Sequence, residues 1–245
     1  MTKPSVLIIG ARSDIGRAVA HKFAGLGYSV QLAARDVSTL EADKTDMELR
    51  YGVLVSLEEF DALATGKHEA FVAALPALPQ IVVCAVGLMG QQAESECDIE
   101  AAARVMRSNY EGPASILSIL ANRFEERGSG TIVGISSVAG DRGRATNYVY
   151  GSAKAGFTAF LSGLRNRLAK RGVHVVTVLP GFVVTQMTEG MDLPGRLTAE
   201  PSEVAQAIAR AVERKTDVIY VRSIWRLIML VIRNIPERIF KRMSI

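Results

Sequence analysis

The sequence predicts a single α/β domain with a doubly wound, mainly parallel sheet of about seven strands. Two observations carry this prediction. Short apolar runs rich in β-branched residues alternate with amphipathic stretches of helical period, and strands of this kind separated by helices are typical of a parallel sheet covered on both faces. The chain has 245 residues, 49% of them hydrophobic, which is enough for one sizeable core.

Each predicted strand is a short apolar run. In chain order these runs lie at 5–9, 29–34, 53–56, 80–86, 130–137, 174–180 and 217–221. The connecting segments, such as 15–27 and 201–215, repeat apolar residues at helical spacing and are predicted to be helices. The polar stretch 36–52 is instead predicted to be a short, irregular crossover. No repeat or linker marks a second domain, so one domain is assigned to 1–221 and a basic amphipathic C-terminal extension to 222–245.

Composition narrows the functional classes. Two cysteines without CxxC spacing and three scattered histidines argue for a reducing compartment and against a disulfide framework or a metal site. No signal peptide is evident, and no apolar run approaches the roughly 20 residues of a membrane span, so we expect a cytoplasmic protein. The net charge of +4 is concentrated in 221–245, which holds six basic residues and one acid. This asymmetry predicts an anionic partner for the tail and gives little support to nucleic-acid binding.

The segment VLIIGARSDIGRAVA turns from the first strand into a helix, with Gly10 at the strand end and Gly16 inside the helix. Backbone N–H groups and the helix dipole at such a turn suit a pyrophosphate. The alternative is a purely structural turn with Asp14 as the helix N-cap. The dinucleotide contacts expected here are Gly10, Arg12, Ser13, Asp14, Ile15 and Gly16.

The second strand ends in QLAARD, which bears on the choice of dinucleotide. Ala34 fills the position where an acid would bind a ribose 2′-OH, and Arg35 follows it. Arg35 and Arg12 are predicted to bind a 2′-phosphate, because guanidinium groups match phosphate geometry. The prediction is therefore NADPH over NADH. The alternative is that Arg35 and Asp36 form a solvated surface pair.

The segment TNYVYGSAKAG holds two tyrosines ahead of one lysine. Tyr150 and Lys154 are four residues apart and therefore share one helix face, whereas Tyr148 points elsewhere. An ammonium group beside a phenol lowers the phenol pKa and prepares it to exchange a proton with a carbonyl or alcohol oxygen. By itself this spacing is common. Ser137 in ISSVAG can hydrogen-bond the same oxygen, and Asn109 in RSNYEG can hold a water beside Lys154.

These elements together resemble the short-chain dehydrogenase/reductase family over about residues 5–221. The matching elements, in family order, are Gly10 and Gly16, Asn109, Ser137, Tyr150 with Lys154, and PGFVVT at 180–185. The resemblance implies a Rossmann fold, a homodimer or homotetramer, and Tyr150 as catalytic acid/base. Lys154 would lower the pKa of Tyr150 and bind the nicotinamide ribose, Ser137 would stabilise the reacting oxygen, and Asn109 would complete a proton relay. The further cofactor contacts implied are Ala85, Gly87, Pro180, Gly181, Val183 and Thr185.

The sequence departs from the family pattern at two sites besides Asp14, which replaces a middle glycine. CAVG stands at 84–87 in place of NNAG. Ser56 or Leu57 stands where the family has an aspartate that meets the adenine amino group. The four catalytic positions are unaffected.

Two segments bear on the substrate. The loop 181–202 is rich in Met and Leu, which favours an apolar ligand or else a lid packed on its own core. In the tail, an apolar stripe is predicted with arginines on the opposite side and Trp225 near the start. The stripe comprises Ile224, Leu227, Ile228, Val231, Ile232 and Ile235. Such a helix suits an anionic membrane surface; the alternative is a helix packed on the core or in a subunit interface.

The tail and the segments around 84–90 and 136–156 also resemble a narrower branch, the decaprenylphosphoryl-2-keto-ribose reductases. That resemblance implies a lipid-linked keto-sugar as substrate, at the inner face of the cytoplasmic membrane, with Arg142 and Arg144 meeting its phosphate. The leading hypothesis is therefore an NADPH-dependent ketoreductase acting there. A soluble reductase of a 3-oxoacyl thioester or small ketone is the second hypothesis, and a non-catalytic NADPH-binding protein is the third.

Overall fold

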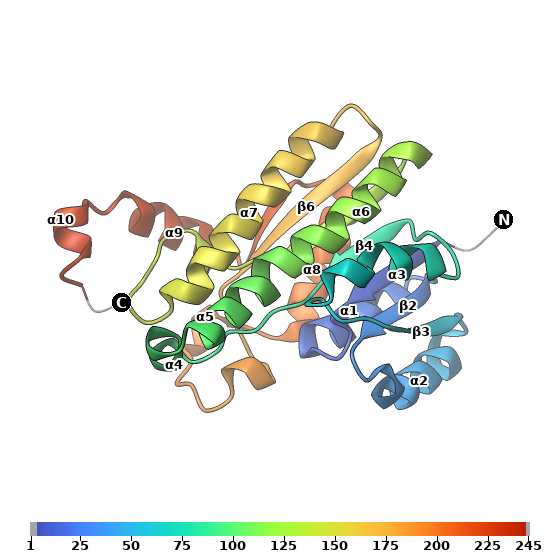
Figure 1. The fold of residues 1–245 in the computed structure, drawn as a ribbon, viewed down its shortest axis with the longest axis horizontal. Helices are drawn as coiled ribbons and strands as arrows, with labels where there is room; N and C mark the ends of the chain where they lie inside the picture. Colours follow the sequence, from blue (N-terminus) through green and yellow to red (C-terminus); the bar gives the residue numbers. More distant parts are fainter. Residues whose placement is uncertain (1–3, 244–245) are drawn as a thin grey trace.

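Seven parallel strands form one sheet in the computed structural model, which describes residues 4–243 (Figure 1). The strand order is β3-β2-β1-β4-β5-β6-β9, and every neighbouring pair is parallel. The strands are β1 (Ser5–Ile9), β2 (Ser29–Ala34), β3 (Val55–Glu59), β4 (Ile81–Cys84), β5 (Gly130–Ile135), β6 (Val173–Pro180) and β9 (Val218–Val221). The predicted doubly wound, seven-stranded sheet in a single domain is confirmed.

Helices cover both faces of the sheet, as its apolar central strands require. One buried cluster joins the sheet to α1 (Asp14–Ala24), α2 (Glu41–Tyr51) and α8 (Pro201–Arg214). The other joins it to α3 (His68–Ala74), α6 (Gly112–Arg127) and α7 (Tyr148–Leu168). The strand order reverses between β1 and β4, and a crevice at that point is the usual ligand site of such sheets.

The remaining elements are short. They are α4 (Gln92–Cys97), α5 (Ile99–Met106), a π-helical turn (Arg107–Glu111), β7 (Phe182–Val183), β8 (Thr198–Ala199), α9 (Ile224–Asn234) and α10 (Glu237–Phe240). Within the described residues, 3-10 turns lie at Val37–Leu40, Thr65–Lys67, Val138–Gly140, Gln186–Thr188 and Gly195–Leu197. The π-helical turn joins α5 to α6 and contains Asn109. Pro113 follows it and has no N–H to donate to the carbonyl of Asn109, so regular α-helix cannot run through this point.

The prediction of an irregular crossover at 36–52 is wrong. A 3-10 turn leads directly into α2, which Gly52 ends in the left-handed conformation. An i,i+4 ion pair between Asp46 and Arg50 supports the helix at 2.7 Å. Met47 is its one fully covered side chain, so the apolar repeat that would indicate a helix is nearly absent. β3 was also predicted two residues too early, and it continues to Glu59.

The tail helix α9 packs on the domain, and the predicted apolar stripe is split between two faces. Trp225 and Met229 are 5% and 4% exposed and pack with Val138 and Leu179. The expectation of Trp225 at a membrane surface is therefore wrong. An outer face, comprising Ile224, Leu227, Leu230 and Val231, is between 48% and 61% exposed. No helix within residues 4–243 is long and apolar enough to cross a membrane; Ser244 and Ile245 lie outside the described residues.

Candidate active site

In the turn between β1 and α1, two glycines lie in close contact with neighbouring backbone. Gly10 has φ +87°, and a Cβ there would lie 2.9 Å from the Ala85 carbonyl carbon. A Cβ on Gly16 would lie 2.5 Å from the carbonyl oxygen of Gly10. Glycine is therefore required at both positions, as predicted for a dinucleotide turn. The alternative with Asp14 as N-cap is wrong, because the Ser13 hydroxyl accepts the hydrogen bond from the N–H of Gly16 at 3.0 Å.

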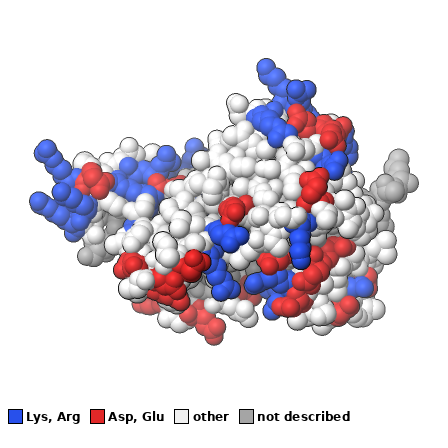
Figure 2. All heavy atoms as spheres, viewed as in Figure 1, with Lys and Arg blue, Asp and Glu red and all other residues white. Residues whose placement is uncertain are grey.

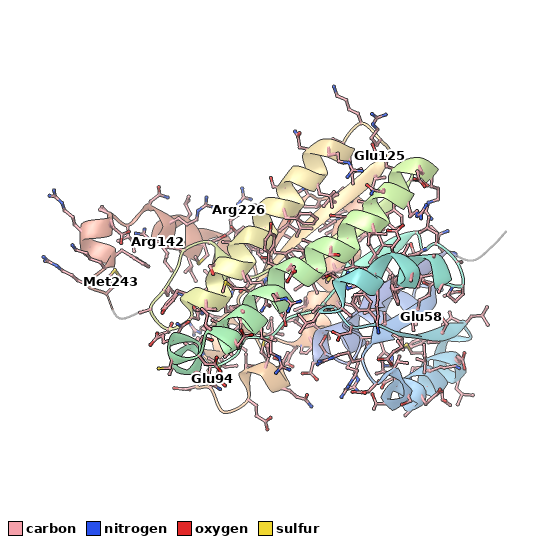
Figure 3. All side chains as sticks on the ribbon, in the orientation of Figure 1. Glu58, Glu94, Glu125, Arg142, Arg226 and Met243 are labelled. Carbon is pink, nitrogen blue, oxygen red and sulfur yellow. The ribbon has the colours of Figure 1, made fainter. Side chains whose placement is uncertain are left out.

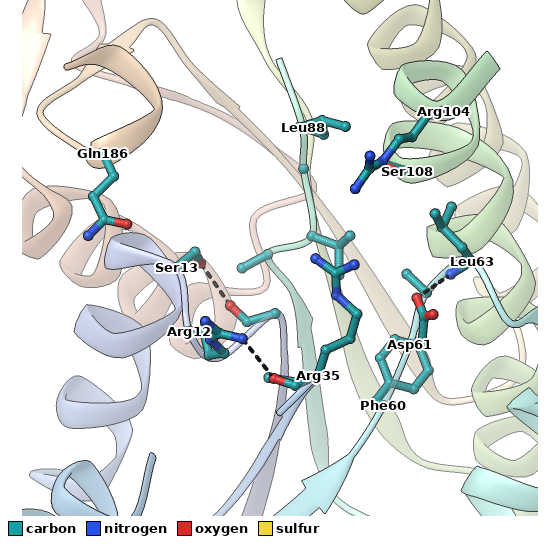
Figure 4. A pocket seen from close by; sticks show the side chains of 16 residues that line it. Arg12, Ser13, Arg35, Phe60, Asp61, Leu63, Leu88, Arg104, Ser108 and Gln186 are labelled. Atoms are coloured by element: carbon teal, nitrogen blue, oxygen red, sulfur yellow. Dashed lines mark hydrogen bonds between the residues drawn. The ribbon is translucent and has the colours of Figure 1, made fainter. Parts of the chain in front are cut away.

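A cavity of about 410 Å³ lies beside this turn, between β1, β2, β4 and α5 (Figure 4). We call it the glycine-turn cavity. Of the predicted dinucleotide contacts, it is lined by Gly10, Arg12, Ser13, Arg35, Ala85 and Gly87. Asp14 lies outside its lining and instead accepts a hydrogen bond from the N–H of Gln186 at 2.9 Å. Ile15 lines the adjoining cavity described below.

Two arginines stand at the mouth of the glycine-turn cavity, where a 2′-phosphate is expected. Arg12 donates to the Asp36 carboxylate and to the carbonyl of Arg35, both at 3.1 Å. The predicted alternative of an Arg35–Asp36 pair is thus replaced by an Arg12–Asp36 pair. The Arg35 guanidinium extends into the cavity (Figure 4) and forms no ion pair within residues 4–243.

Sequence reasoning missed several residues that line this cavity, above all Phe60 and Asp61. Ser56 and Leu57 were assigned to the strand end, but both pair with β2 inside the sheet, opposite Gln31 and Leu32. Their side chains cannot substitute for the missing aspartate. Asp61 follows the true end of β3, and one of its carboxylate oxygens accepts from the N–H of Leu63 at 2.9 Å. Arg104 of α5 points into the cavity from the opposite side (Figure 4).

Three of the four predicted catalytic residues, all but Asn109, line the adjoining cavity of about 150 Å³, which we call the tyrosine cavity. Ser137, Tyr150 and Lys154 all line it. α7 begins at Tyr148, so Tyr150 and Lys154 lie one turn apart as predicted, with the Lys154 ammonium 5.8 Å from the centre of the Tyr150 ring. Lys154 is 3% exposed and donates to the carbonyl of Ile135 at 3.1 Å. Tyr148 is 46% exposed and does not line the cavity.

The pKa values of the pair are governed by burial. Burial raises the pKa of Tyr150 to about 12, against the opposing effect of a hydrogen bond from Ser137. Burial also lowers the pKa of Lys154 to about 8. The expected lowering of the Tyr150 pKa by Lys154 is not seen in this structure: burial raises that pKa, and the opposing effect comes from Ser137. Lys154 is the group whose proton is easily moved near neutral pH.

Asn109 is fully buried and holds the loop after β4. Its side-chain nitrogen donates to the carbonyls of Leu88 and Val105 at 2.6 and 2.8 Å, and its side-chain oxygen accepts from the N–H of Leu88 at 3.2 Å. These bonds brace the loop in which CAVG replaces NNAG. A Cβ on Gly87 would lie 3.2 Å from the Asn109 side-chain oxygen and 3.6 Å from the Lys154 nitrogen. Gly87, Asn109 and Lys154 therefore adjoin, as the predicted relay requires.

The segment after β6 closes the tyrosine cavity. Pro180, Gly181, Val183 and Thr185 line it, as predicted for cofactor contacts, together with Met187 and Met191. Trp225 of α9 also lines it and stacks edge-on against Phe182. The indole N–H donates to the carbonyl of Leu197 at 3.0 Å. The tail therefore forms part of the cavity wall, which the sequence did not indicate.

The structure separates the two arginines that the sequence grouped. Arg142 lies beside the tail (Figure 3). It donates to the carbonyls of Ile232, Arg233 and Ile235 and to Glu237. Its guanidinium also lies over the Phe240 ring at 3.8 Å. Assigning Arg142 to a substrate phosphate is therefore wrong. Arg144 does line the tyrosine cavity.

A glycine turn at the switch point of a parallel sheet, next to a Ser–Tyr–Lys cluster, defines a nicotinamide-dinucleotide-dependent oxidoreductase. Residues 4–193 match the short chain dehydrogenase family, so the chain belongs to that family. It is 37% identical to an uncharacterized oxidoreductase of Mycobacterium tuberculosis, over 97% of this chain and 96% of that protein. It is 35% identical to an uncharacterized oxidoreductase of Streptomyces coelicolor, over 98% and 96%.

Solved structures of similar fold include two that hold NADPH. A short-chain dehydrogenase from Sphingobium yanoikuyae in complex with NADPH superposes with a TM-score of 0.81 at 25% identity, covering 96% of this chain and 97% of that one. A variant of the actinorhodin polyketide ketoreductase with NADPH gives 0.80 at 25% identity, over 89% and 95%. The protein is an oxidoreductase of the short chain dehydrogenase family. The glycine turn and the two arginines fit NADPH, since a Cβ on either glycine would fill the cradle.

Proposed function

We propose that the protein is an NADPH-dependent reductase of a ketone carried on a lipid-linked, anionic sugar. The reductase part of this proposal rests on one observation. Ser137, Tyr150 and Lys154 line one cavity that adjoins the glycine turn. When bound, the nicotinamide supplies a hydride to the carbonyl carbon. Every other part of the reaction falls to residues of this chain.

Each catalytic residue has one role in this proposal. Ser137 and Tyr150 hydrogen-bond the carbonyl oxygen, and the protonated Tyr150 delivers its proton there as the general acid. Its raised pKa keeps it protonated at neutral pH. Lys154, whose pKa is about 8, returns a proton to Tyr150, and Asn109 holds the water that connects Lys154 to solvent. Thr185 and Gly87 orient the cofactor beside the cavity.

The lipid-linked substrate is supported by the apolar wall of the cavity and by the outer face of α9. Met89, Phe182, Met191 and Trp225 line the tyrosine cavity. The outer face of α9 is apolar and exposed, and basic side chains gather at the α9–α10 end of the molecule (Figure 2). Exposed apolar side chains next to arginines suit the surface of an anionic bilayer. We propose peripheral contact there, at the inner face of the cytoplasmic membrane.

The second candidate is a soluble reductase of a 3-oxoacyl thioester or small ketone. In that case a second copy of the chain, in a homodimer or homotetramer, covers the outer face of α9. The two candidates differ in what α9 contacts, and so they can be separated without knowing the substrate.

The test is cosedimentation of the NADPH-bound protein with vesicles that contain an anionic polyprenyl phosphate. We expect binding that weakens with salt and is lost when Leu227 and Val231 are both replaced by Glu. The matched control replaces Leu49 and Leu54, which are 83% and 75% exposed elsewhere on the surface, and should bind normally. The second candidate would be favoured if the unmodified protein does not bind the vesicles but forms dimers, and if replacing Leu227 and Val231 with Glu disrupts those dimers.

A further inference from the structure

The charged side chains that line the tyrosine cavity are basic. Among the 23 residues of the described chain that line it, the charged side chains are Arg144 and Lys154, both cationic, and none is Asp or Glu. Lys154 is buried beneath the cavity and is engaged by the Ile135 carbonyl. The positive charge of Arg144 is therefore left without a role in the proposed reaction.

Arg144 is half-buried yet has no partner. Within residues 4–243 its guanidinium forms no hydrogen bond and no ion pair, and burial lowers its pKa from the ordinary value. Arg142, two residues earlier, bonds three carbonyls and a carboxylate. A partly desolvated cation without a counter-charge is costly, so an anion placed against it would bind with a favourable electrostatic term.

Asn147 contributes a second polar group without a hydrogen-bond partner to the lining of the tyrosine cavity. Its side-chain oxygen is buried without a hydrogen-bond partner in the described chain, and the residue lines the cavity next to Arg144 and Tyr150. The N–H of Asn147 donates to the carbonyl of Arg144 at 3.1 Å, which closes a tight turn just before α7. The turn therefore presents a cation and a hydrogen-bond acceptor on the substrate side of Tyr150.

We propose that Arg144 binds an anionic group, phosphate or carboxylate, on the substrate, while Asn147 accepts a hydrogen bond from a neighbouring substrate hydroxyl. The guanidinium fork matches the geometry of both anions, and the low solvent access of the site strengthens its attraction to either one. This inference rests on the proposed function in that it assigns substrate to the tyrosine cavity. It makes Arg144 the residue that selects an anionic over a neutral ketone.

Binding to the NADP⁺-saturated protein tests the site without turnover. The probes are butyl phosphate, methyl phosphate, butanoate and butanol, measured by calorimetry and by thermal shift. We expect the anions to bind at least tenfold more tightly than butanol, and Arg144→Gln to abolish that difference. Arg226→Gln, which removes the same charge from the exposed side of α9, is the control and should bind like the unmodified protein. Arg144→Lys should recover part of the affinity.

The comparison of probes also identifies the source of the anion. Tighter binding of butyl than methyl phosphate would assign the site to a phosphate with an apolar chain. Equal binding would assign it to a small free phosphate, and a preference for butanoate to a carboxylate. Anion binding that is absent, or that persists unchanged in Arg144→Gln, would overturn the proposal.

Turnover separates this inference from the proposed function. For hydroxyacetone phosphate and hydroxyacetone with NADPH, we expect Arg144→Gln to raise KM for the phosphate at least tenfold and to change kcat/KM for the neutral ketone less than threefold. If the unmodified protein reduces no ketone but shows the Arg144-dependent binding, the reductase proposal fails and the anion site stands. If it reduces both ketones equally well, the selectivity assigned to Arg144 is wrong.

Discussion

Arg142, which lies five residues after Ser137, donates a 2.6 Å hydrogen bond to the carbonyl of Ile235 just beyond the end of α9. It also bonds the carbonyls of Ile232 and Arg233. The end of a helix leaves its last carbonyls short of backbone donors; here Ile232 accepts one backbone bond, from the N–H of Ile235 at 3.3 Å. One side chain thus holds the tail against the loop that follows Ser137, and Trp225 of the tail lines the same cavity as Ser137.

Replacing Arg142 with Gln should release the end of α9. Because several carbonyls lose their donor, we expect hydrogen exchange of amides in 230–240 to accelerate at least tenfold, corresponding to about 1–3 kcal/mol of local stability. Arg226→Gln, on the exposed side of α9, should leave exchange unchanged. Unaltered protection in Arg142→Gln would mean that apolar packing alone holds the tail.

Gly181 and Trp225 should be coupled energetically. A Cβ on Gly181 would lie 2.0 Å from the indole ring, so Gly181→Ala forces the ring to move and should cost about 1–3 kcal/mol in the free energy of unfolding. Trp225→Leu removes the clash, and the double variant should lose less stability than the two single variants together. Urea unfolding of all four proteins measures this coupling. Strict additivity would show that α9 adjusts to the extra methyl group.

Tyr150→Phe should lower kcat by about 10²–10⁴-fold, as expected for a lost general acid, with little effect on NADPH binding. Tyr148→Phe is the matched control, because Tyr148 starts the same helix but lies outside the tyrosine cavity; its kcat should change less than threefold. Steady-state NADPH oxidation with any accepted ketone provides the measurement. A loss below tenfold in Tyr150→Phe would reject Tyr150 as the acid.

Much of this arrangement could be predicted from the sequence, because it depends on local spacing. Residues that are close together in the sequence determine the apolar strands, the glycine turn and the four-residue separation of Tyr150 and Lys154. Contacts between distant segments could not be predicted. Arg142 and Arg144 have the same chemistry and are two residues apart, yet one caps the tail and the other lines the cavity. Likewise, periodicity identified the apolar residues of α9 but not which of its apolar faces the domain covers.

Lys154→Met should stabilise the ligand-free protein at neutral pH while abolishing activity. The pKa of Lys154 is lowered from 10.5 to about 8, so the amine is charged at neutral pH but holds its proton less strongly in the native state than in the unfolded chain. Stability linked to this group is present above pH 10.5 and is lost as pH falls through 8, when the buried amine must become charged. Below pH 8 this linkage lowers the free energy of unfolding of the unmodified protein by about 3 kcal/mol. Lys154→Met should recover that amount less about 1 kcal/mol, because the Ile135 carbonyl loses its donor.

The pH dependence distinguishes this desolvation effect from improved packing by the methionine. We expect Lys154→Met to exceed the unmodified protein in the free energy of unfolding at pH 6.5, and the difference to shrink as pH rises to about 10. Urea unfolding at several pH values measures it. Lys170→Met, at an exposed position just after α7, should show no such trend. A difference for Lys154→Met that is constant with pH would show that Lys154 remains charged in the native protein throughout this range.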